Sequence, residues 1–312
     1  GSLGKLGRIS SSNIKYVTQI KQLNLSSIES LSMVFYGGKN ITGSIPDLPK
    51  GLRIGSWIFG DCSGLTGNIP ELPAGLTDGS MMFSGCSGLS GSIPRLPASL
   101  EDGSSMFQNC SGLTGDIPSL PASLKDGSNM FDGCKNLEGE VLEFPAALED
   151  GAWMFRGCES LFSDIPEFPK GLTRAYGMFE DSGFGGNIPE LPKALTDGSS
   201  MFEGSYVRGN IPELPANLTD GSRMFKDCYF LSGNIPELPA SLTDGTAMFY
   251  SCSGLSGNIP KLPANLTDGS WMFYYCSGLT GNIPELPNSL RDGGYMFNGC
   301  SRLTGNIPKF PN

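Results

Sequence analysis

The sequence predicts a repeat solenoid: a right-handed superhelix with a parallel β-sheet on one face and short turns or single helical turns on the other. The main observation is a phenylalanine that recurs every 24 residues, with two steps of 23, at positions 35, 59, 83, 107, 131, 155, 179, 202, 225, 249, 273 and 297. A unit this short cannot bury its own apolar face, so neighbouring units must stack and share one core. We call each unit a coil and name it by this phenylalanine.

Composition agrees with an ordered, turn-rich chain. The 312 residues include 44 glycines and 23 prolines, yet 38% are hydrophobic, which is too many for a disordered low-complexity segment. The net charge of −10 repels phosphate backbones and anionic lipid headgroups, so we expect neither nucleic acid nor a membrane surface as a partner. No apolar run reaches the roughly 18–20 residues that span a bilayer, so direct membrane insertion is not expected either.

Each element of the coil follows from a short motif. In the coil of Phe273, residues 279–283 (Leu-Thr-Gly-Asn-Ile) alternate inward apolar or small residues with outward polar ones, as in a half-buried strand. Pro284 ends the strand because it donates no hydrogen bond to a sheet, and Pro287 keeps the return segment extended. Asp268-Gly269 then predicts a tight turn, in which the aspartate caps a single helical turn leading to Phe273.

The repeats define the expected domain organisation. Residues 1–34 are more charged and lack the prolines, so we expect an N-terminal cap and a degenerate first repeat. Residues 35–312 form about twelve repeats of 23–24 residues in a single solenoid domain, which we expect to be monomeric. Gly1-Ser2 resembles a cloning remnant, and we expect a signal peptide to have been removed ahead of it.

The recurring Met-Phe-x-x-Cys-x-x-Leu-Thr motif, followed by a strand and a leucine-bearing return, resembles the BspA-like leucine-rich repeats of bacterial and some protozoan surface proteins. The resemblance covers about residues 28–312. It implies a leucine-rich-repeat fold, display at the cell surface or secretion, and a role in adhesion or protein binding. It supplies no catalytic residue.

The nine cysteines all lie three residues after the phenylalanine of their coil. Cysteines one coil apart come within disulfide range, but stacked side chains point the same way rather than toward each other. A column of buried free thiols is therefore expected, and a disulfide framework or a thiolate metal site is the alternative. In the two coils where the step shortens to 23 residues, serine replaces cysteine, at Ser182 and Ser205, and the missing residue falls just after the serine. This indicates that cysteine belongs to one corner geometry.

Two columns of polar residues suggest two other functions, calcium binding and ice binding. One aspartate per coil, as at Asp268, is too widely spaced for a calcium site, and capping explains it better, so neither a metal nor a cofactor is expected. The outward Thr and Asn positions resemble an ice-binding array, but residues such as Glu138, Asp164 and Arg208 interrupt it.

Outward positions that vary along the repeats are the candidates for recognition. All three tryptophans lie two residues before the phenylalanine of their coil, at Trp57, Trp153 and Trp271, and we expect them to be partly exposed. Clusters of tryptophan and tyrosine often anchor interfaces. Candidate partner-binding residues are Tyr250, Trp271, Tyr274, Tyr275 and Tyr295 near the C-terminal end, with Trp57 and Trp153 in the same column. A second candidate is the sheet face around Glu138, Glu140, Phe162, Asp164 and Arg208.

The sequence thus favours a non-enzymatic module at the cell surface or outside the cell. Its expected partner is a protein, such as a host surface protein or a component of the extracellular matrix; a glycan is also possible. Alternatives are a passive structural spacer and a carbohydrate- or ice-binding array. An enzyme is not expected, because the chain contains no histidine and no acid–base or nucleophile–base pair can be assigned.

Overall fold

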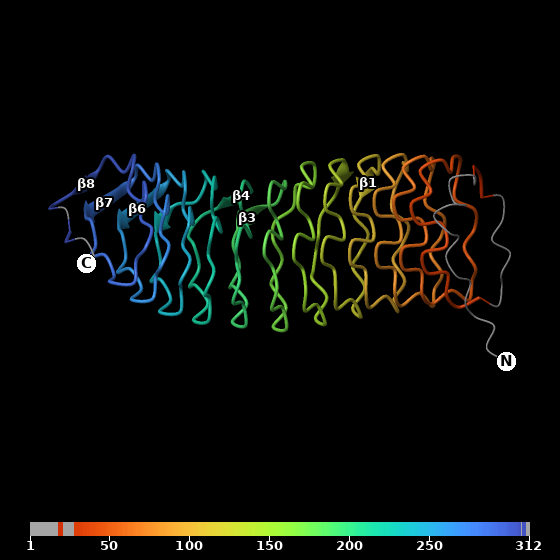
Figure 1. The fold of residues 1–312 in the computed structure, drawn as a ribbon, viewed down its shortest axis with the longest axis horizontal. Coiled ribbons are helices and arrows are strands. Elements are labelled where there is room, and N and C mark those ends of the chain that lie inside the picture. Colours follow the sequence, from red (N-terminus) through yellow and green to blue (C-terminus); the bar gives the residue numbers. More distant parts are fainter. Residues whose placement is uncertain (1–17, 21–27, 307, 310–312) are drawn as a thin grey trace. The chain divides into compact units, whose positions relative to one another are not determined.

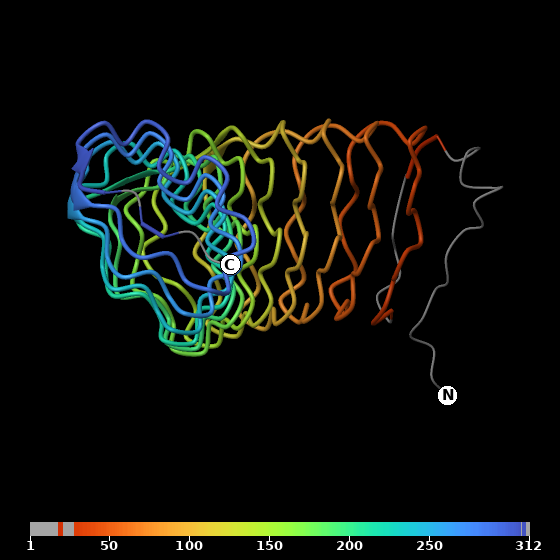
Figure 2. The same cartoon turned by 60° about the vertical axis from the view of Figure 1, so that its left-hand side comes forward.

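A computed structural model describes residues 18–20, 28–306, 308 and 309. The chain divides into two compact units, residues 1–162 and 163–312, which we describe separately. Most of the expected N-terminal cap, residues 1–34, lies outside the described residues, and the single-domain organisation stays a prediction. Within each unit successive coils lie side by side (Figure 1, Figure 2).

Parallel strands form along one side of the coils, as the alternating motif predicts. The pairing is β1 with β2 in the first unit, and β3 with β4 and β5-β6-β7-β8 in the second. All pairs are parallel, with registers such as Gly257↔Leu279. The strands are β1 (Gly115–Asp116), β2 (Leu137–Glu138), β3 (Gly185–Asn187), β4 (Tyr206–Arg208), β5 (Gly233–Asn234), β6 (Leu255–Asn258), β7 (Leu279–Asn282) and β8 (Leu303–Thr304).

The inward and outward sides of the strands match the prediction. In β6, Leu255 is buried, whereas Ser256 and Asn258 are exposed, and Ile259 after the strand is again buried. The strands are only two to four residues long, and several coils contribute isolated bridges such as Gly67↔Leu89. The glycine in each motif has a positive φ, +74° at Gly257, and pairs with the leucine of the next coil, as Gly257 does with Leu279.

The opposite side of each coil consists of short turns, and no helix is found within the described residues. A left-handed residue two positions before the phenylalanine explains this: φ is 53° at Met81. Alternate N–H groups then point to different acceptors. Met81 and Phe83 donate to the carbonyls of Ser104 and Met106 in the next coil, at 2.8 and 2.9 Å, whereas Met82 donates to Gly79 within its own coil. A helical turn would keep these bonds inside one coil; the observed turn uses half of them to join coils.

The aspartate of each turn does act as a cap. Oδ1 of Asp78 accepts hydrogen bonds from the backbone N–H of Ser80 at 3.0 Å and from its hydroxyl at 2.7 Å. The same arrangement recurs at Asp102, Asp126 and Asp268. The aspartates also form parallel bridges between coils, such as Asp78↔Asp102. They therefore fix the turn and align successive coils.

The core is a set of stacked columns. Phe83 and Phe107 are fully buried and their ring centroids lie 5.8 Å apart, and neighbouring rings stack similarly in both units. Met272, Phe273, Cys276 and Leu279 are fully buried, as predicted. The isoleucine column is buried at most positions, although Ile283 is half-buried.

Candidate interaction surface

The predicted aromatic residues of the second unit lie together in one cluster, which we call the aromatic patch: Tyr250, Trp271, Tyr274, Tyr275 and Tyr295. Tyr250 stacks on Tyr274 with ring centroids 4.7 Å apart, and Trp271 stacks on Tyr295 at 4.5 Å. Trp271 and Tyr275 each contact Tyr274, at 4.8 and 4.4 Å. The patch spans three consecutive coils.

The repeat itself positions these rings. Trp271 and Tyr295 occupy the left-handed position before the phenylalanine, with φ of 62° and 57°, and Tyr275 occupies a second left-handed position, with φ of 55°. Stacking coils brings equivalent positions side by side, so rings in one column meet their neighbours. Tyr275 and Tyr295 are 53% and 61% exposed, whereas Trp271, Tyr250 and Tyr274 are half-buried. The patch is thus a layer of three half-buried rings that contact two exposed tyrosines, Tyr275 and Tyr295.

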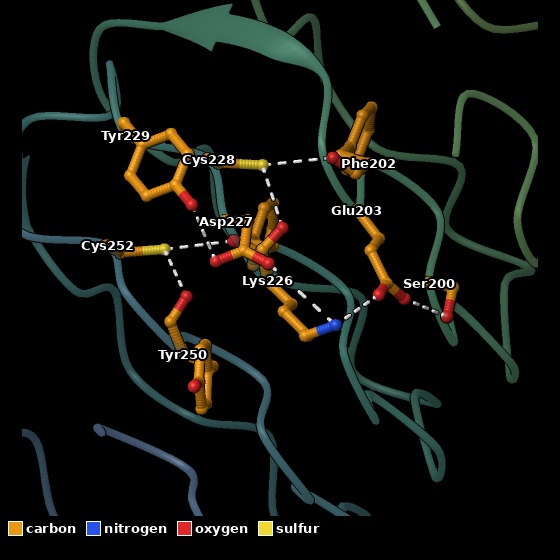
Figure 3. Close-up of polar contacts among 10 residues, drawn as sticks. Ser200, Phe202, Glu203, Lys226, Asp227, Cys228, Tyr229, Tyr250 and Cys252 are labelled. Atoms are coloured by element: carbon orange, nitrogen blue, oxygen red, sulfur yellow. Dashed lines mark hydrogen bonds and ion pairs between the residues drawn. The ribbon is translucent and has the colours of Figure 1, made fainter. Parts of the chain in front are cut away.

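A charged network borders the patch (Figure 3). The Nζ of Lys226 lies 2.6 Å from Glu203 and 3.8 Å from Asp227, and 5.9 Å from the ring centroid of Tyr250. Burial opposes the charge of Lys226, but the hydrogen bond that Lys226 donates to Glu203 and the negative charge of Glu203 raise the pKa of Lys226 overall. The ammonium group therefore stays protonated beside the aromatic layer.

The other two tryptophans lie in the first unit and have separate surroundings. Trp57 is half-buried and meets Tyr36 edge to face at 5.0 Å. Trp153 is half-buried below the guanidinium of Arg156, which lies 5.8 Å from its ring and donates to Asp132 at 2.9 Å. Both tryptophans are partly exposed, as expected, but neither is part of the aromatic patch.

The second candidate, the sheet face, is distributed over both units. Glu138, Glu140 and Phe162 belong to the first unit, and Asp164 and Arg208 to the second; all five are exposed. Phe162 is 68% exposed. Glu140 lines a shallow pocket of about 90 Å³ together with Val141 and Leu142. The structure does not bring these residues together within one unit.

Three exposed aromatic residues were not among the sequence candidates. Tyr206, Tyr229 and Phe230 are 52%, 56% and 59% exposed. The rings of Tyr206 and Phe230 stack at 6.2 Å, and the hydroxyl of Tyr229 donates to Asp227 at 3.0 Å. The signal was present in the sequence: the coil of Phe225 reads Cys-Tyr-Phe-Leu where five other coils read Cys-Ser-Gly-Leu.

The cysteine column is buried and its nine thiols are free. Each thiol donates a hydrogen bond to the carbonyl of the phenylalanine in the preceding coil, as from Cys86 to Phe59 at 3.1 Å. Ser182 and Ser205 instead donate to the phenylalanine of their own coil, both at 2.7 Å. Burial raises the pKa of the thiols, to about 11 at Cys62 and about 12 at Cys134. The column therefore packs and aligns the coils and is chemically unreactive.

The aspartate column is committed to the turns described above. Burial raises the pKa of Asp102, while the hydrogen bonds from Ser104 act in the opposite direction. Within the described residues, no group of three His, Cys, Asp or Glu side chains is arranged to hold a metal ion. None of the described residues belongs to a helix that could cross a membrane.

Comparison with known proteins places this geometry in context. A family model described as a BspA type leucine rich repeat region matches residues 26–162 and 190–309, in six copies. No relative was found among curated protein sequences.

Similar solved structures are leucine-rich-repeat proteins of bacteria. One from Bacteroides ovatus is 23% identical with a TM-score of 0.59, over 95% of this chain and 80% of that one. YopM from Yersinia enterocolitica is 21% identical with a TM-score of 0.50, over 94% of this chain and 60% of that one. At these identities the similarity establishes the fold: a leucine-rich-repeat solenoid with parallel strands.

Proposed function

Since the chain belongs to the BspA type leucine-rich repeat family, we propose that it is a non-enzymatic, protein-binding module, secreted or displayed at the cell surface, whose second unit engages its partner through the aromatic patch. The BspA resemblance of the Met-Phe-x-x-Cys repeats supports surface display. The partner is a host surface protein or a component of the extracellular matrix.

The observation that carries the proposal is the mutual contact of five aromatic side chains on three adjacent coils. Other coils have small residues at these positions, such as Ser105, Gly60 and Gly85, so the fold does not require the rings. Trp271 and Tyr274 support Tyr275 and Tyr295 from below, which limits the conformational entropy lost when a partner packs on them. Tyrosine and tryptophan anchors of this kind carry much of the energy of protein interfaces.

The stacking also favours a protein over a stacked sugar at this patch. Tyr250 covers one face of Tyr274, and Trp271 covers one face of Tyr295, with interplanar angles of 17° and 23°. Ring edges and hydroxyl groups are then available to the partner, along with the ammonium of Lys226. Such a surface can pack against apolar side chains and donate hydrogen bonds to backbone carbonyls.

The proposal is tested by removing the two prominent rings while keeping the backbone conformation. Tyr275→Gly and Tyr295→Gly are suitable because both residues have positive φ and glycine adopts it without strain. The intact chain and the double variant are compared for binding to purified extracellular-matrix proteins and host-cell surface proteins by surface plasmon resonance. We expect the double variant to weaken binding at least about 100-fold, the loss of roughly 3 kcal/mol typical of interface anchors.

A matched control is available in the first unit. Asn109→Gly and Asn129→Gly change residues in the same two columns, with φ of 59° and 55°, and should leave binding unchanged. If the aromatic double variant binds as tightly as the intact chain, the patch is not the interface. If the intact chain binds no protein in the panel, the passive spacer becomes the better account.

A further inference from the structure

The aromatic patch lies in a block of three coils whose outward turn positions are uncharged. Its rings come from three columns: the position two before the phenylalanine of a coil and the two positions after it. In three consecutive coils these columns hold Ala247, Tyr250, Ser251, Trp271, Tyr274, Tyr275, Tyr295, Asn298 and Gly299. In the preceding coil all three positions are charged: Arg223, Lys226 and Asp227. A partner that covers the patch therefore needs no charged side chain to match these columns.

The charged groups nearest to the patch have partners of their own. Asp268 and Asp292 each lie three residues before a ring of the patch. Oδ1 of Asp268 accepts hydrogen bonds from Ser270 at 2.9 and 2.7 Å, and Oδ1 of Asp292 accepts one from the N–H of Gly294 at 2.8 Å. On the other side, Lys226 is paired within the network of Figure 3.

An exposed amide lies between the two exposed tyrosines. In the coil of Phe273 the rings of the three columns contact one another in order, at 4.8 and 4.4 Å. The next coil has Tyr295, Asn298 and Gly299 in the same columns. The ring of Tyr275 reaches across to this coil, because a Cβ on Gly299 would lie 2.5 Å from its Cδ1. Asn298 thus has a tyrosine ring on either side, and its side chain is exposed.

These exposed groups can donate hydrogen bonds outward. The hydroxyls of Tyr275 and Tyr295 each carry one proton to donate, and the amide of Asn298 carries two. The patch columns contain no carboxylate that would accept hydrogen bonds from a partner. The surface is therefore best matched by a partner that offers carbonyl oxygens and few N–H groups.

The spacing of the coils matches one such backbone. Adjacent strands lie about 4.8 Å apart, so coils two apart are separated by roughly 9.5 Å. The patch keeps this spacing, with ring centroids 4.7 Å apart for Tyr250 and Tyr274 and 4.5 Å apart for Trp271 and Tyr295. A polyproline II helix rises about 3.1 Å per residue and repeats every three residues, which is roughly 9.3 Å. Laid along the stack, it would present the same side to every second coil.

We propose that the aromatic patch binds a proline-rich segment of its protein partner in the polyproline II conformation; this rests on the proposed function of the patch. Proline rings pack on aromatic side chains in sites of this kind. The polyproline II backbone has no internal hydrogen bonds, so its carbonyls accept from the two tyrosine hydroxyls and from Asn298. Proline has no N–H and a fixed φ, so the segment needs no acceptor from the patch and loses little entropy on binding.

The test uses a nonaproline peptide with blocked ends and, as control, the same peptide with alternating L- and D-proline. The control has the same composition but cannot form the left-handed helix. Binding is followed in the full chain through the indole N–H signals of Trp57, Trp153 and Trp271, with Trp271→Phe assigning the third. Nonaproline should shift the Trp271 signal with a Kd of about 1 mM or tighter and leave the other two unchanged. The control peptide should shift none.

Variants separate the rings from their hydrogen bonds. Tyr275→Phe with Tyr295→Phe keeps both rings and removes both hydroxyl donors, which should weaken nonaproline binding about tenfold. Tyr275→Gly with Tyr295→Gly should abolish it. Asn109→Gly with Asn129→Gly in the first unit should leave it unchanged. The signals of Trp57 and Trp153 also report whether each variant is folded.

Three results would overturn the proline-rich segment as the ligand: no shift of the Trp271 signal with nonaproline, equal binding of the control peptide, or equal binding by the glycine double variant. The proposed function is judged separately by the partner in surface plasmon resonance. If the intact chain binds that partner and Tyr275→Gly with Tyr295→Gly loses it, while nonaproline does not bind, the patch remains the interface and the proline-rich segment is rejected.

Discussion

Replacing Gly88 by alanine adds one methyl group at a point where two coils approach closely. The new Cβ would lie 2.5 Å from the backbone oxygen of Leu65 and 3.0 Å from that of Ser63, in the preceding coil. Gly88 does not have positive φ, so the cost comes from this approach alone. Backbone atoms cannot rotate away as a side chain does, and overpacking of this kind costs about 1–3 kcal/mol.

Gly75 provides a control in the same coil. A Cβ there meets nothing within 4 Å, and its φ is not positive either. Alanine at Gly75 should stabilise the protein by about 0.4–1 kcal/mol, because it reduces the freedom of the unfolded chain. The two variants should therefore differ by about 1.4–4 kcal/mol in the free energy of unfolding.

Urea unfolding followed by tryptophan fluorescence measures this difference, since Trp57 lies in the adjacent coil. One other coil has a larger residue, Asn136, at the position equivalent to Gly88. The side-chain amide of Asn136 donates a hydrogen bond to the carbonyl of Ser111 at 2.9 Å, which offsets the cost of the close approach. Alanine at Gly88 has no such compensation. Equal stability of the two variants would refute the reasoning, because the glycine column would then not be required by coil stacking.

Three other results follow from the described contacts. Burial raises the pKa of Cys62 and Cys300 to about 11, so both thiols remain protonated at pH 8. Their alkylation, measured by mass spectrometry, should be slow in the folded protein and complete in urea. Fast alkylation of the folded chain would contradict this. Asp126→Ala removes the acceptor for the N–H and hydroxyl of Ser128 and should lower the free energy of unfolding in urea by about 1 kcal/mol, whereas Asp126→Asn should retain most of it. Tyr275→Gly relieves a left-handed backbone conformation, which costs roughly 1 kcal/mol in residues other than glycine. The thermal midpoint of this variant should therefore equal or exceed that of the intact chain. A marked decrease would show that the tyrosine ring supports the fold.

Much of the fold could be predicted from the sequence, because packing in a solenoid acts column by column. The regular spacing of phenylalanine, cysteine and leucine predicted which residues stack in the core, and Phe273, Cys276 and Leu279 are fully buried. The alternation in residues 279–283 predicted the outward and inward sides of the strand. These inferences depend on spacing alone, which the sequence displays directly.

The turn was harder to predict, since its hydrogen bonds join different coils. The Asp-Gly motif correctly indicated a cap, as at Asp78. It could not indicate that the next residues alternate between local and intercoil acceptors, because a left-handed conformation at Met81 has no signature in its side chain. Tryptophan, arginine, serine and alanine all occupy that position in other coils.

The candidate surfaces also include one contact that could be predicted from the sequence and one that could not. Tyr250 and Tyr274 share a column, and Trp271 lies three residues before Tyr274 in the same coil. The sequence was therefore sufficient to predict that the three are neighbours, and their ring contacts confirm this. The contact between Tyr206 and Phe230 was missed because the two belong to different columns. It depends on the residue missing from the shortened coil, whose effect on the next coil requires a three-dimensional structure.

The proposed protein interface is tested most directly by photo-crosslinking from the patch itself. A benzophenone amino acid replaces Tyr275 in one protein and Asn109 in another; both positions are exposed, lie two residues after the phenylalanine of their coil, and have φ of 55° and 59°. Each protein is illuminated in the presence of the partner found by surface plasmon resonance. The proposed interface predicts a covalent product from position 275 and none from position 109. Equal products from both positions, or a product only from position 109, would contradict it.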